Sequence, residues 1–324
     1  MATTALKIDR KKSGNPFLDD VHEGLSAAAK YIPPKYFYDA EGDRLFSKIM
    51  GLPEYYLTRT EQGILTNYRS EILRNFNDGG SFDLVELGAG DGFKTKILLR
   101  HFTERDAHFR YVPIDISNHA LSGLTRSIAA EFPDLEVAPV PGEYFRALHS
   151  LQGSTARKAV LFLGASIGNF TFDQALHFLR DLRETLNQGD QVLIGFDLKK
   201  NPREILAAYN DSQGVTRDFN LNLLKRINRE LGADFTLSQF EHYPLYDPQT
   251  GEAKSFLVSK CAQEVAVPQL GKTFHFEDGE TIHTEISRKY SLSEIALLAE
   301  LAGFSPVQNF TDPKNRFVDA LWKC

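Results

Sequence analysis

The chain has 324 residues and a mass of 36.5 kDa, so its length predicts one large domain or two intertwined ones. Its hydrophobic content of 42% and charged content of 25% exclude a disordered or collagen-like chain. The net charge of -6 argues against nucleic acid as a partner, because phosphate binding needs a basic face. We therefore expect a small-molecule partner.

Two cysteines, Cys261 and Cys324, are too few for a disulfide framework, which fits a reducing compartment. The amino-terminal segment 1–16 lacks the apolar region of a signal peptide. No run approaches the ~18 apolar residues that span a bilayer. We therefore expect a cytoplasmic protein with no membrane partner, and a monomer is as well supported as a homodimer.

From Phe82 onward, short apolar runs alternate with helical periodicity, which predicts βα units and a parallel sheet. The predicted strands are residues 82–87, 109–116, 135–140, 159–166 and 191–198. Helices are expected between them, including residues 118–132 and one that opens with a capping box of Thr171 and Gln174. The pattern from about 201 to 232 is again helical.

The last third of the chain predicts a different kind of sheet. Alternating polarity around 235–246, 254–262 and 281–290 suits antiparallel strands with one solvated face. A helix over 292–302, capped by Ser291 or Ser293, and strands over 305–310 and 317–324 complete the chain.

Five βα-type strands, an insertion and a final helix-strand-strand are the order of a class I, Rossmann-like methyltransferase sheet, and the fold class is therefore α/β. We assign residues 61–199 and 289–324 to this core. Residues 14–60 and 200–288 are surplus to it and predict a second, α+β domain for substrate recognition.

A glycine-rich loop, LVELGAGDG (84–92), joins a predicted strand to a helix at the edge where α/β sheets bind ligands. Its GxGxG spacing resembles an S-adenosylmethionine loop more than a dinucleotide fingerprint. Asp115 ends the second strand and can accept hydrogen bonds from a ribose diol. Gly142-Glu143-Tyr144 occupies the usual place of adenine contacts, and Lys94 faces either the ligand carboxylate or solvent.

Three further groups suit an amino-acid acceptor. Asn169 in GASIGNF ends the fourth strand, where an amide can hold an amine and a carboxylate, although Asn beside Gly also forms ordinary turns. In HTEISRKY (283–290), a strand would place His283, Glu285 and Ser287 on one face, which suits an imidazole or simply water. Residues 33–61 are rich in tyrosine, which suits a pocket wall or ordinary core.

The motifs together resemble the histidine-specific Nα-methyltransferases of ergothioneine biosynthesis. They are PPKYFYDAEGDRLF, LPEYYLTRTE, LVELGAGDGFKT, LGASIGNF, AAYNDSQGVTRDFNLNLL, INRELGADF and HTEIS. The resemblance runs from about residue 18 to the end of the chain. It implies methyl transfer from S-adenosylmethionine to the α-amino group of free L-histidine, continued to N,N,N-trimethylhistidine, with no metal.

The resemblance also implies individual roles. S-adenosylmethionine would be bound by Gly88, Lys94, Asp115, Gly142, Glu143 and Tyr144. Asn169 and Tyr209 would hold the amino and carboxylate groups of the substrate, and Tyr55, Glu285 and Ser287 would bind the imidazole. Tyr38, near Phe46, would lie close to the reacting nitrogen, so that Tyr38 and Asn169 form the catalytic pair.

The chain departs from the family pattern at two places, of which the first concerns the substrate pocket and the second is not expected to change the cofactor. Lys254 and Ser255 stand where the family usually has a Glu-Met pair, and the loop GAGDG replaces a GSG spelling. An aromatic amino acid such as tryptophan therefore stays an alternative substrate. Glu285 argues against it, because an indole has only one N–H with which to satisfy a buried carboxylate. A non-catalytic S-adenosylmethionine-binding protein is the second alternative.

Overall fold

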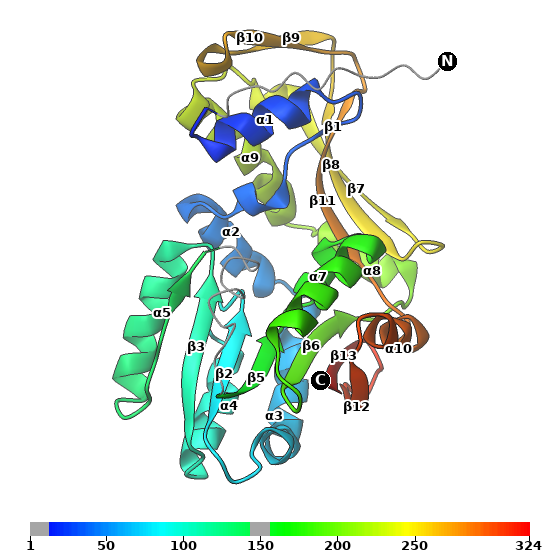
Figure 1. Cartoon of the computed structure of the whole chain (residues 1–324). Helices are drawn as coiled ribbons and strands as arrows, with labels where there is room; N and C mark the ends of the chain where they lie inside the picture. Colours follow the sequence, from blue (N-terminus) through cyan, green and yellow to red (C-terminus); the bar gives the residue numbers. More distant parts are fainter. Residues whose placement is uncertain (1–12, 143–155) are drawn as a thin grey trace, which may run out of the picture. The chain divides into compact units, whose positions relative to one another are not determined.

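The computed structural model describes residues 13–142 and 156–324. The chain forms two compact units (Figure 1). The smaller unit contains residues up to Leu45 together with Gly214–Pro244 and Ser255–Glu285. The larger unit contains Phe46–Gln213, Leu245–Lys254 and Ile286–Cys324.

A seven-stranded sheet forms the centre of the larger unit, with the strand order β12-β13-β6-β5-β2-β3-β4. The strands are β2 (Phe82–Leu87), β3 (Phe109–Asp115), β4 (Val140–Pro141), β5 (Arg157–Phe162), β6 (Gln191–Asp197), β12 (Ser305–Thr311) and β13 (Phe317–Lys323). The five strands β6, β5, β2, β3 and β4 run parallel. β13 runs antiparallel to β6 and to β12. This confirms the predicted class I sheet with its terminal hairpin.

Helices cover both faces of this sheet, because its central strands are apolar on both sides. One core contains side chains of α3 (Leu57–Phe76), α4 (Thr95–Glu104), α5 (Asn118–Glu131) and α8 (Pro202–Tyr209). The other core contains side chains of α7 (Phe172–Thr185) and α10 (Leu292–Leu301). The result is a three-layer α/β unit.

Local signals in the sequence account for most helix starts. Thr171 and Gln174 form the predicted capping box of α7, and Ser291, not Ser293, caps α10 in a second box with Glu294. The predicted strand over 135–140 is wrong in extent: β4 covers only Val140–Pro141, preceded by a single bridge at Val137. Pro139 and Pro141 explain this, since proline cannot donate to a strand ladder.

The smaller unit combines helices with short strands. Its elements are α1 (Pro16–Ser26), β1 (Lys30–Tyr31), η1 (Pro34–Phe37), α9 (Val215–Leu231), η3 (Leu237–Gln239), β9 (Gln263–Val267), η4 (Pro268–Leu270) and β10 (Lys272–Phe276). A four-stranded sheet has the order β1-β11-β8-β7, formed with β7 (Phe240–Asp247), β8 (Glu252–Ser259) and β11 (Thr281–Arg288). The β9–β10 hairpin, closed by Gly271 at φ +58°, was not predicted.

The division between the units differs from the boundaries inferred from sequence. The second half of α2 (Ala40–Met50), all of α8 and residues 245–254 belong to the larger unit. The reason is packing: Tyr56, Ile205 and Tyr209 enter the same apolar core as α3 and α4. Sequence periodicity marks these segments as amphipathic but does not say which core receives them.

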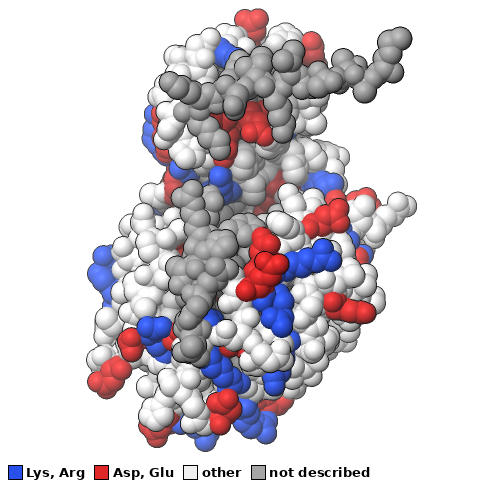
Figure 2. Space-filling view, viewed as in Figure 1, with Lys and Arg blue, Asp and Glu red and all other residues white. Residues whose placement is uncertain are grey.

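Two surface properties complete the description. On the visible face of the larger unit, acidic and basic side chains are interspersed (Figure 2). Within the described part of the chain, none of the helices combines the length and the apolar character needed to cross a membrane.

Candidate functional site

The glycine loop (residues 88–92) folds over the carboxyl end of β3. Gly88, Gly90 and Gly92 have φ values of +73°, +55° and +67°, in the left-handed region that favours glycine. The N–H groups of Gly88 and Ala89 both donate to the Ile114 carbonyl oxygen, at 2.8 and 3.1 Å. A Cβ on Gly90 would meet no atom of the described residues within 4 Å, so these residues leave the backbone there open to close approach by a ligand.

Asp115 links this loop to the end of β3. One carboxylate oxygen accepts the Gly90 N–H at 2.8 Å, and the other accepts the Ser117 N–H at 2.8 Å. Burial raises the pKa of Asp115, and these backbone donors oppose the shift. A carboxylate has about four acceptor positions, so both oxygens keep room for further donors such as ribose hydroxyls.

The third cofactor segment is only partly described. Gly142 donates its N–H to the Asp115 carbonyl oxygen at 3.0 Å and has a φ of +139°. The carboxyl ends of β3 and β4 are thereby held together. Glu143 and Tyr144, the other two predicted adenine contacts, lie outside the described residues.

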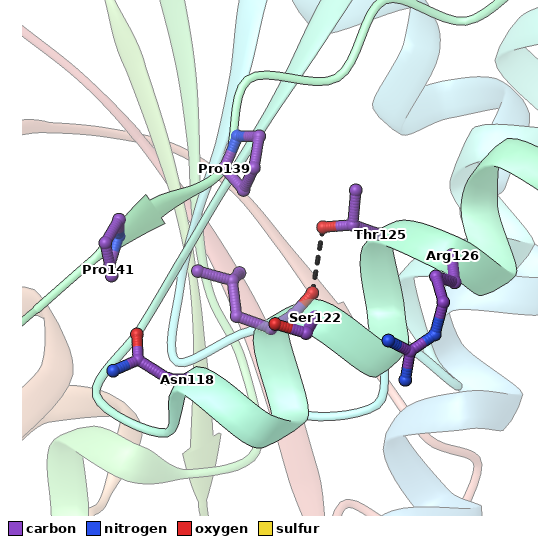
Figure 3. Close-up of a pocket in the computed structure, with 7 residues that line it drawn as sticks. Asn118, Ser122, Thr125, Arg126, Pro139 and Pro141 are labelled. Atoms are coloured by element: carbon purple, nitrogen blue, oxygen red, sulfur yellow. Dashed lines mark hydrogen bonds between the residues drawn. The ribbon is translucent and has the colours of Figure 1, made fainter.

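A hollow of about 410 Å³ lies beside this edge, between α5 and the segment around β4. Figure 3 shows Ser122, Thr125 and Arg126 of α5 on one side, with Pro139 and Pro141 on the other. None of the described residues predicted to bind the cofactor lines the hollow. It therefore borders the candidate site without being formed by it.

A buried carboxyl group, Glu86, lies in β2 just before the glycine loop. Glu86 of β2 accepts hydrogen bonds from the hydroxyls of Thr95 and Tyr111. Burial raises the pKa of Glu86 to about 7, against the lowering effect of these two donors. Glu86 thus joins β2 to β3 and to the first turn of α4.

Lys94, at the start of α4, is an ion-paired residue and not a solvated helix lysine. It pairs with Glu61 of α3, which is wholly buried and also accepts the Gly164 N–H at 2.7 Å. Asp319 of β13 is likewise wholly buried, and burial together with the Glu61 charge raises its pKa well above the ordinary value. Glu61 therefore connects the start of α4 with the segment that follows β5.

The segment that follows β5 carries Asn169 in a short 3-10 helix, η2 (Ser166–Asn169). Ala165 before it has a φ of +57°, which is uncommon for a residue with a side chain. A Cβ on Gly168 would lie 2.8 Å from the Arg288 carbonyl oxygen and 3.5 Å from Ser287 Oγ. Gly168, the neighbour of half-buried Asn169 in η2, therefore packs directly on the end of β11.

Tyr209, Ser287 and four other residues of the larger unit form one buried hydrogen-bonded group, here called the lysine network. Its members are Tyr56, Asp197, Lys200, Tyr209, Ser287 and Lys289. The Tyr209 hydroxyl donates to Ser287 Oγ at 2.7 Å. Lys289 Nζ donates to Tyr209 Oη at 2.7 Å and to Ser287 Oγ at 2.8 Å. Two predicted substrate residues are thus joined through a lysine.

Tyr55 also belongs to the larger unit, in the turn before α3. Its ring is half-buried and meets the ring of Phe46 edge-on, with centroids 6.2 Å apart. Arg59 donates to the Tyr55 carbonyl oxygen at 3.2 Å and to the Leu52 carbonyl oxygen at 3.0 Å, which stiffens the turn.

Tyr38 and Glu285 belong to the smaller unit. Tyr38 follows η1, is 37% exposed, and meets the Phe219 ring edge-on at 6.1 Å. Residues 281–288 form a strand as predicted, so His283, Glu285 and Ser287 share one side of β11, with Ser287 the buried member.

The two residues that depart from the family pattern have ordinary partners. Lys254 forms an ion pair with Glu252 at 2.7 Å. Ser255 is buried, and its Oγ lies 3.3 Å from the His242 ring nitrogen Nε2. Each is therefore accommodated within its own unit.

Sequence reasoning missed Glu61, Asp197 and Lys289, which support the predicted residues. Asp197 had a usable signal, since a carboxylate ends the otherwise apolar strand QVLIGFDL. Glu61 and Lys289 had none, because each sits in a polar stretch where exposure is the ordinary outcome. Among the described residues, no group of three His, Cys, Asp or Glu side chains has the arrangement of a metal site.

Comparison with known proteins agrees with this geometry. The model of the family "Histidine-specific methyltransferase, SAM-dependent" matches residues 17–324. Histidine N-alpha-methyltransferases of Mycolicibacterium smegmatis and Mycobacterium tuberculosis are 39% and 35% identical to the chain, each over 92% of both proteins. Ergothioneine biosynthesis protein 1 of Schizosaccharomyces pombe is 31% identical over 86% of the chain and 37% of that protein. The resemblance seen in the sequence is confirmed: the chain belongs to the histidine-specific, S-adenosylmethionine-dependent methyltransferases.

Proposed function

We propose that this protein transfers methyl groups from S-adenosylmethionine to the α-amino nitrogen of free L-histidine, giving N,N,N-trimethylhistidine. The observation that carries the proposal is the shared position of two groups in the larger unit. The glycine loop with Asp115 lies at the carboxyl edge of the sheet, and Asn169 follows β5 at that same edge. Ligands of open α/β sheets bind at this edge.

The residues of the cofactor edge fit S-adenosylmethionine. The open backbone at Gly90 suits close approach by the ligand, and Asp115 retains acceptor positions for the two ribose hydroxyls. The Lys94 ammonium can pair with the carboxylate of the methionyl part. Gly142 lies in the segment that we assign to the adenine ring. When bound, S-adenosylmethionine supplies an electrophilic methyl group on a sulfonium.

The remaining work of the enzyme is positioning. The amino nitrogen must be neutral and aligned with the sulfur–methyl bond, so fixed contacts to the rest of the amino acid lower the barrier. We assign the amino and carboxylate groups to Asn169 and Tyr209, and the imidazole to Ser287, Glu285 and Tyr55. Tyr38 is assigned to the surroundings of the reacting nitrogen. These contacts can hold histidine while its nitrogen changes from primary to quaternary.

The direct test uses isotope-labelled S-adenosylmethionine with a panel of free amino acids that includes histidine, tryptophan and phenylalanine. We expect mass spectrometry to find label in histidine, with products that carry up to three methyl groups. Label in tryptophan but not in histidine would replace the proposed substrate. Binding of S-adenosylmethionine with no labelled amino acid would favour a non-catalytic protein.

A variant at Glu285 tests the assignment of the imidazole contacts. Glu285→Ala should raise the KM for histidine at least tenfold, since removing a hydrogen bond to a charged group costs about 1.5–3 kcal/mol. The KM for S-adenosylmethionine should change less than about twofold. Equal increases in both constants would contradict the role given to Glu285.

A further inference from the structure

Lys289 is a wholly buried lysine at the end of β11, a position that lysine rarely occupies without a specific partner. Its ammonium has three donors and three partners in the larger unit. They are Tyr209 Oη at 2.7 Å, Ser287 Oγ at 2.8 Å and Asp197 Oδ2 at 3.0 Å. Each N–H of this ammonium group therefore has its own acceptor in the larger unit.

Asp197 is the only carboxylate of the lysine network, and it serves two cations. Its other oxygen lies 2.5 Å from Lys200 Nζ, and the Tyr56 hydroxyl donates to the same carboxylate. Burial lowers the pKa of Lys200, against the raising effect of Asp197. Buried ion pairs add little net stability compared with apolar packing. Stability therefore does not explain the network. The contacts of Lys289 with Tyr209 and Ser287 offer an explanation.

The directions of the hydrogen bonds supply that explanation. An ammonium group can only donate, so Lys289 makes both Tyr209 Oη and Ser287 Oγ acceptors. The Tyr209 hydroxyl then donates its own hydrogen to Ser287. The two lone pairs of Ser287 Oγ are thereby used, and no residue in the described ranges accepts the Ser287 hydrogen. Ser287 can offer a ligand nothing but a donor.

We propose that Lys289 is a positioning residue that makes Ser287 an obligate hydrogen-bond donor toward the substrate ring. The ring must then present a nitrogen with a free lone pair at this position, as a neutral imidazole does. An indole N–H is a donor only, so tryptophan would set two donors against each other. This inference rests on the proposed function, and it names the property by which the site selects its substrate.

The structure contains a matched control in Lys200. Lys289 and Lys200 are both buried and both pair with Asp197, but Lys200 contacts Tyr56 and not Tyr209 or Ser287. Lys289→Met and Lys200→Met each remove one ammonium from the same carboxylate. A purely structural effect should appear in both variants, whereas loss of the fixed Ser287 donor should appear only in Lys289→Met.

The experiment compares histidine with β-(2-thienyl)-L-alanine, which has a five-membered ring without an acceptor nitrogen. The purified full chain is assayed for KM and kcat with histidine, KM for S-adenosylmethionine, and inhibition by the thienyl analogue. In Lys289→Met we expect the KM for histidine to rise about tenfold, the cost of one hydrogen bond. Inhibition by the analogue, kcat and the KM for S-adenosylmethionine should change less than about twofold.

The preference for histidine over the analogue should therefore fall about tenfold in Lys289→Met and stay at its original value in Lys200→Met. An unchanged preference in Lys289→Met, or an equal fall in both variants, overturns the proposal. If Lys289→Met does not fold, Ser287→Ala replaces it, with the same expected fall; an unchanged preference there also overturns the proposal. Absence of histidine methylation by the unaltered chain would instead contradict the proposed function.

Discussion

The two sides of the candidate site in the larger unit are built in different ways. The cofactor side is made largely of backbone: glycine conformations, N–H groups and Asp115, contributed by a continuous βαβ unit. The proposed acceptor side includes Tyr209 and Ser287, which the lysine network holds through side chains up to 233 positions apart, between Tyr56 and Lys289. A site made of backbone groups tolerates substitution of nearby side chains as long as the conformation of the loop is unchanged. A site made of side chains depends on the individual groups proposed to touch the ligand, here Tyr209 and Ser287, and on Lys289, which binds both.

The largest effect is expected at Asp115, whose carboxylate binds the glycine loop and is proposed to bind the ribose of the cofactor. Asp115→Ala removes the acceptor of the Gly90 N–H and the acceptor proposed for two ribose hydroxyls. Hydrogen bonds to a charged group contribute about 1.5–3 kcal/mol each, so the KM for S-adenosylmethionine should rise at least about a hundredfold.

Asp115→Asn is the control, because it keeps the size of the side chain and one carbonyl acceptor. Its KM for S-adenosylmethionine should fall between those of the unaltered chain and Asp115→Ala. The KM for histidine should stay within about twofold in both variants. A normal KM for S-adenosylmethionine in Asp115→Ala would show that the backbone alone forms the cofactor side.

The second prediction concerns Lys94, which we propose binds the cofactor and which pairs with the buried Glu61 carboxylate. Lys94→Met leaves the Glu61 carboxylate buried without its cation, which should lower the free energy of unfolding by about 3 kcal/mol. The KM for S-adenosylmethionine should rise about tenfold through loss of one charged contact. Chemical denaturation and initial-rate kinetics measure the two effects.

The double variant Glu61→Gln/Lys94→Met separates them. It removes both charges, so most of the lost stability should return while the KM for S-adenosylmethionine stays high. Recovery of the KM together with stability would mean that Lys94 acts only through the fold.

The third prediction uses the raised pKa of Glu86, which is about 7 in the folded protein and ordinarily about 4.5. Below pH 4.5 the carboxyl group is protonated whether the chain is folded or unfolded. As the pH rises from 4.5 to 7, the unfolded state ionises first, so stability is lost and then levels off above pH 7.

Relative to Glu86→Gln, the unaltered chain should therefore lose about 3 kcal/mol of unfolding free energy between pH 4.5 and 8. Urea denaturation at a series of pH values gives this difference. A difference that does not vary with pH would contradict a raised pKa of Glu86.

The contrast between the two sides explains what could be predicted from the sequence. Strands, helix caps and the glycine loop depend on near neighbours, so LVELGAGDG and the Thr171–Gln174 box were recognisable directly. The βα order also indicated the sheet correctly. These features need no knowledge of distant residues.

Features formed by distant residues were not predictable in the same way. The pairing of Lys94 with Glu61 and of Lys289 with Asp197 joins polar residues that carry no periodic pattern. The membership of α8 in the larger unit depends on which core accepts Ile205 and Tyr209. Ser287 was indicated by the strand pattern of HTEISRKY, and Tyr209 only by the resemblance to a family. Neither revealed the lysine that joins them.

The smallest expected effect tests how far the lysine network depends on the helix that follows it. Ser291 caps α10, its N–H donates to Glu294 at 2.7 Å, and Glu294 in turn pairs with Arg288 at 3.0 Å. Burial opposes ionisation of Glu294, yet these donors and Lys199 lower its pKa to about 2. Ser291→Ala should therefore cost about 1 kcal/mol of unfolding free energy.

Thr171→Ala is the matched control, because it removes the other capping box, on α7, and should cost about the same. If the network is held by Asp197 and its two lysines, neither variant should change the KM for histidine by more than about twofold. A rise in that KM confined to Ser291→Ala would mean that the start of α10 orients Lys289 and Ser287. The acceptor side would then depend on local capping as well as on contacts between distant residues.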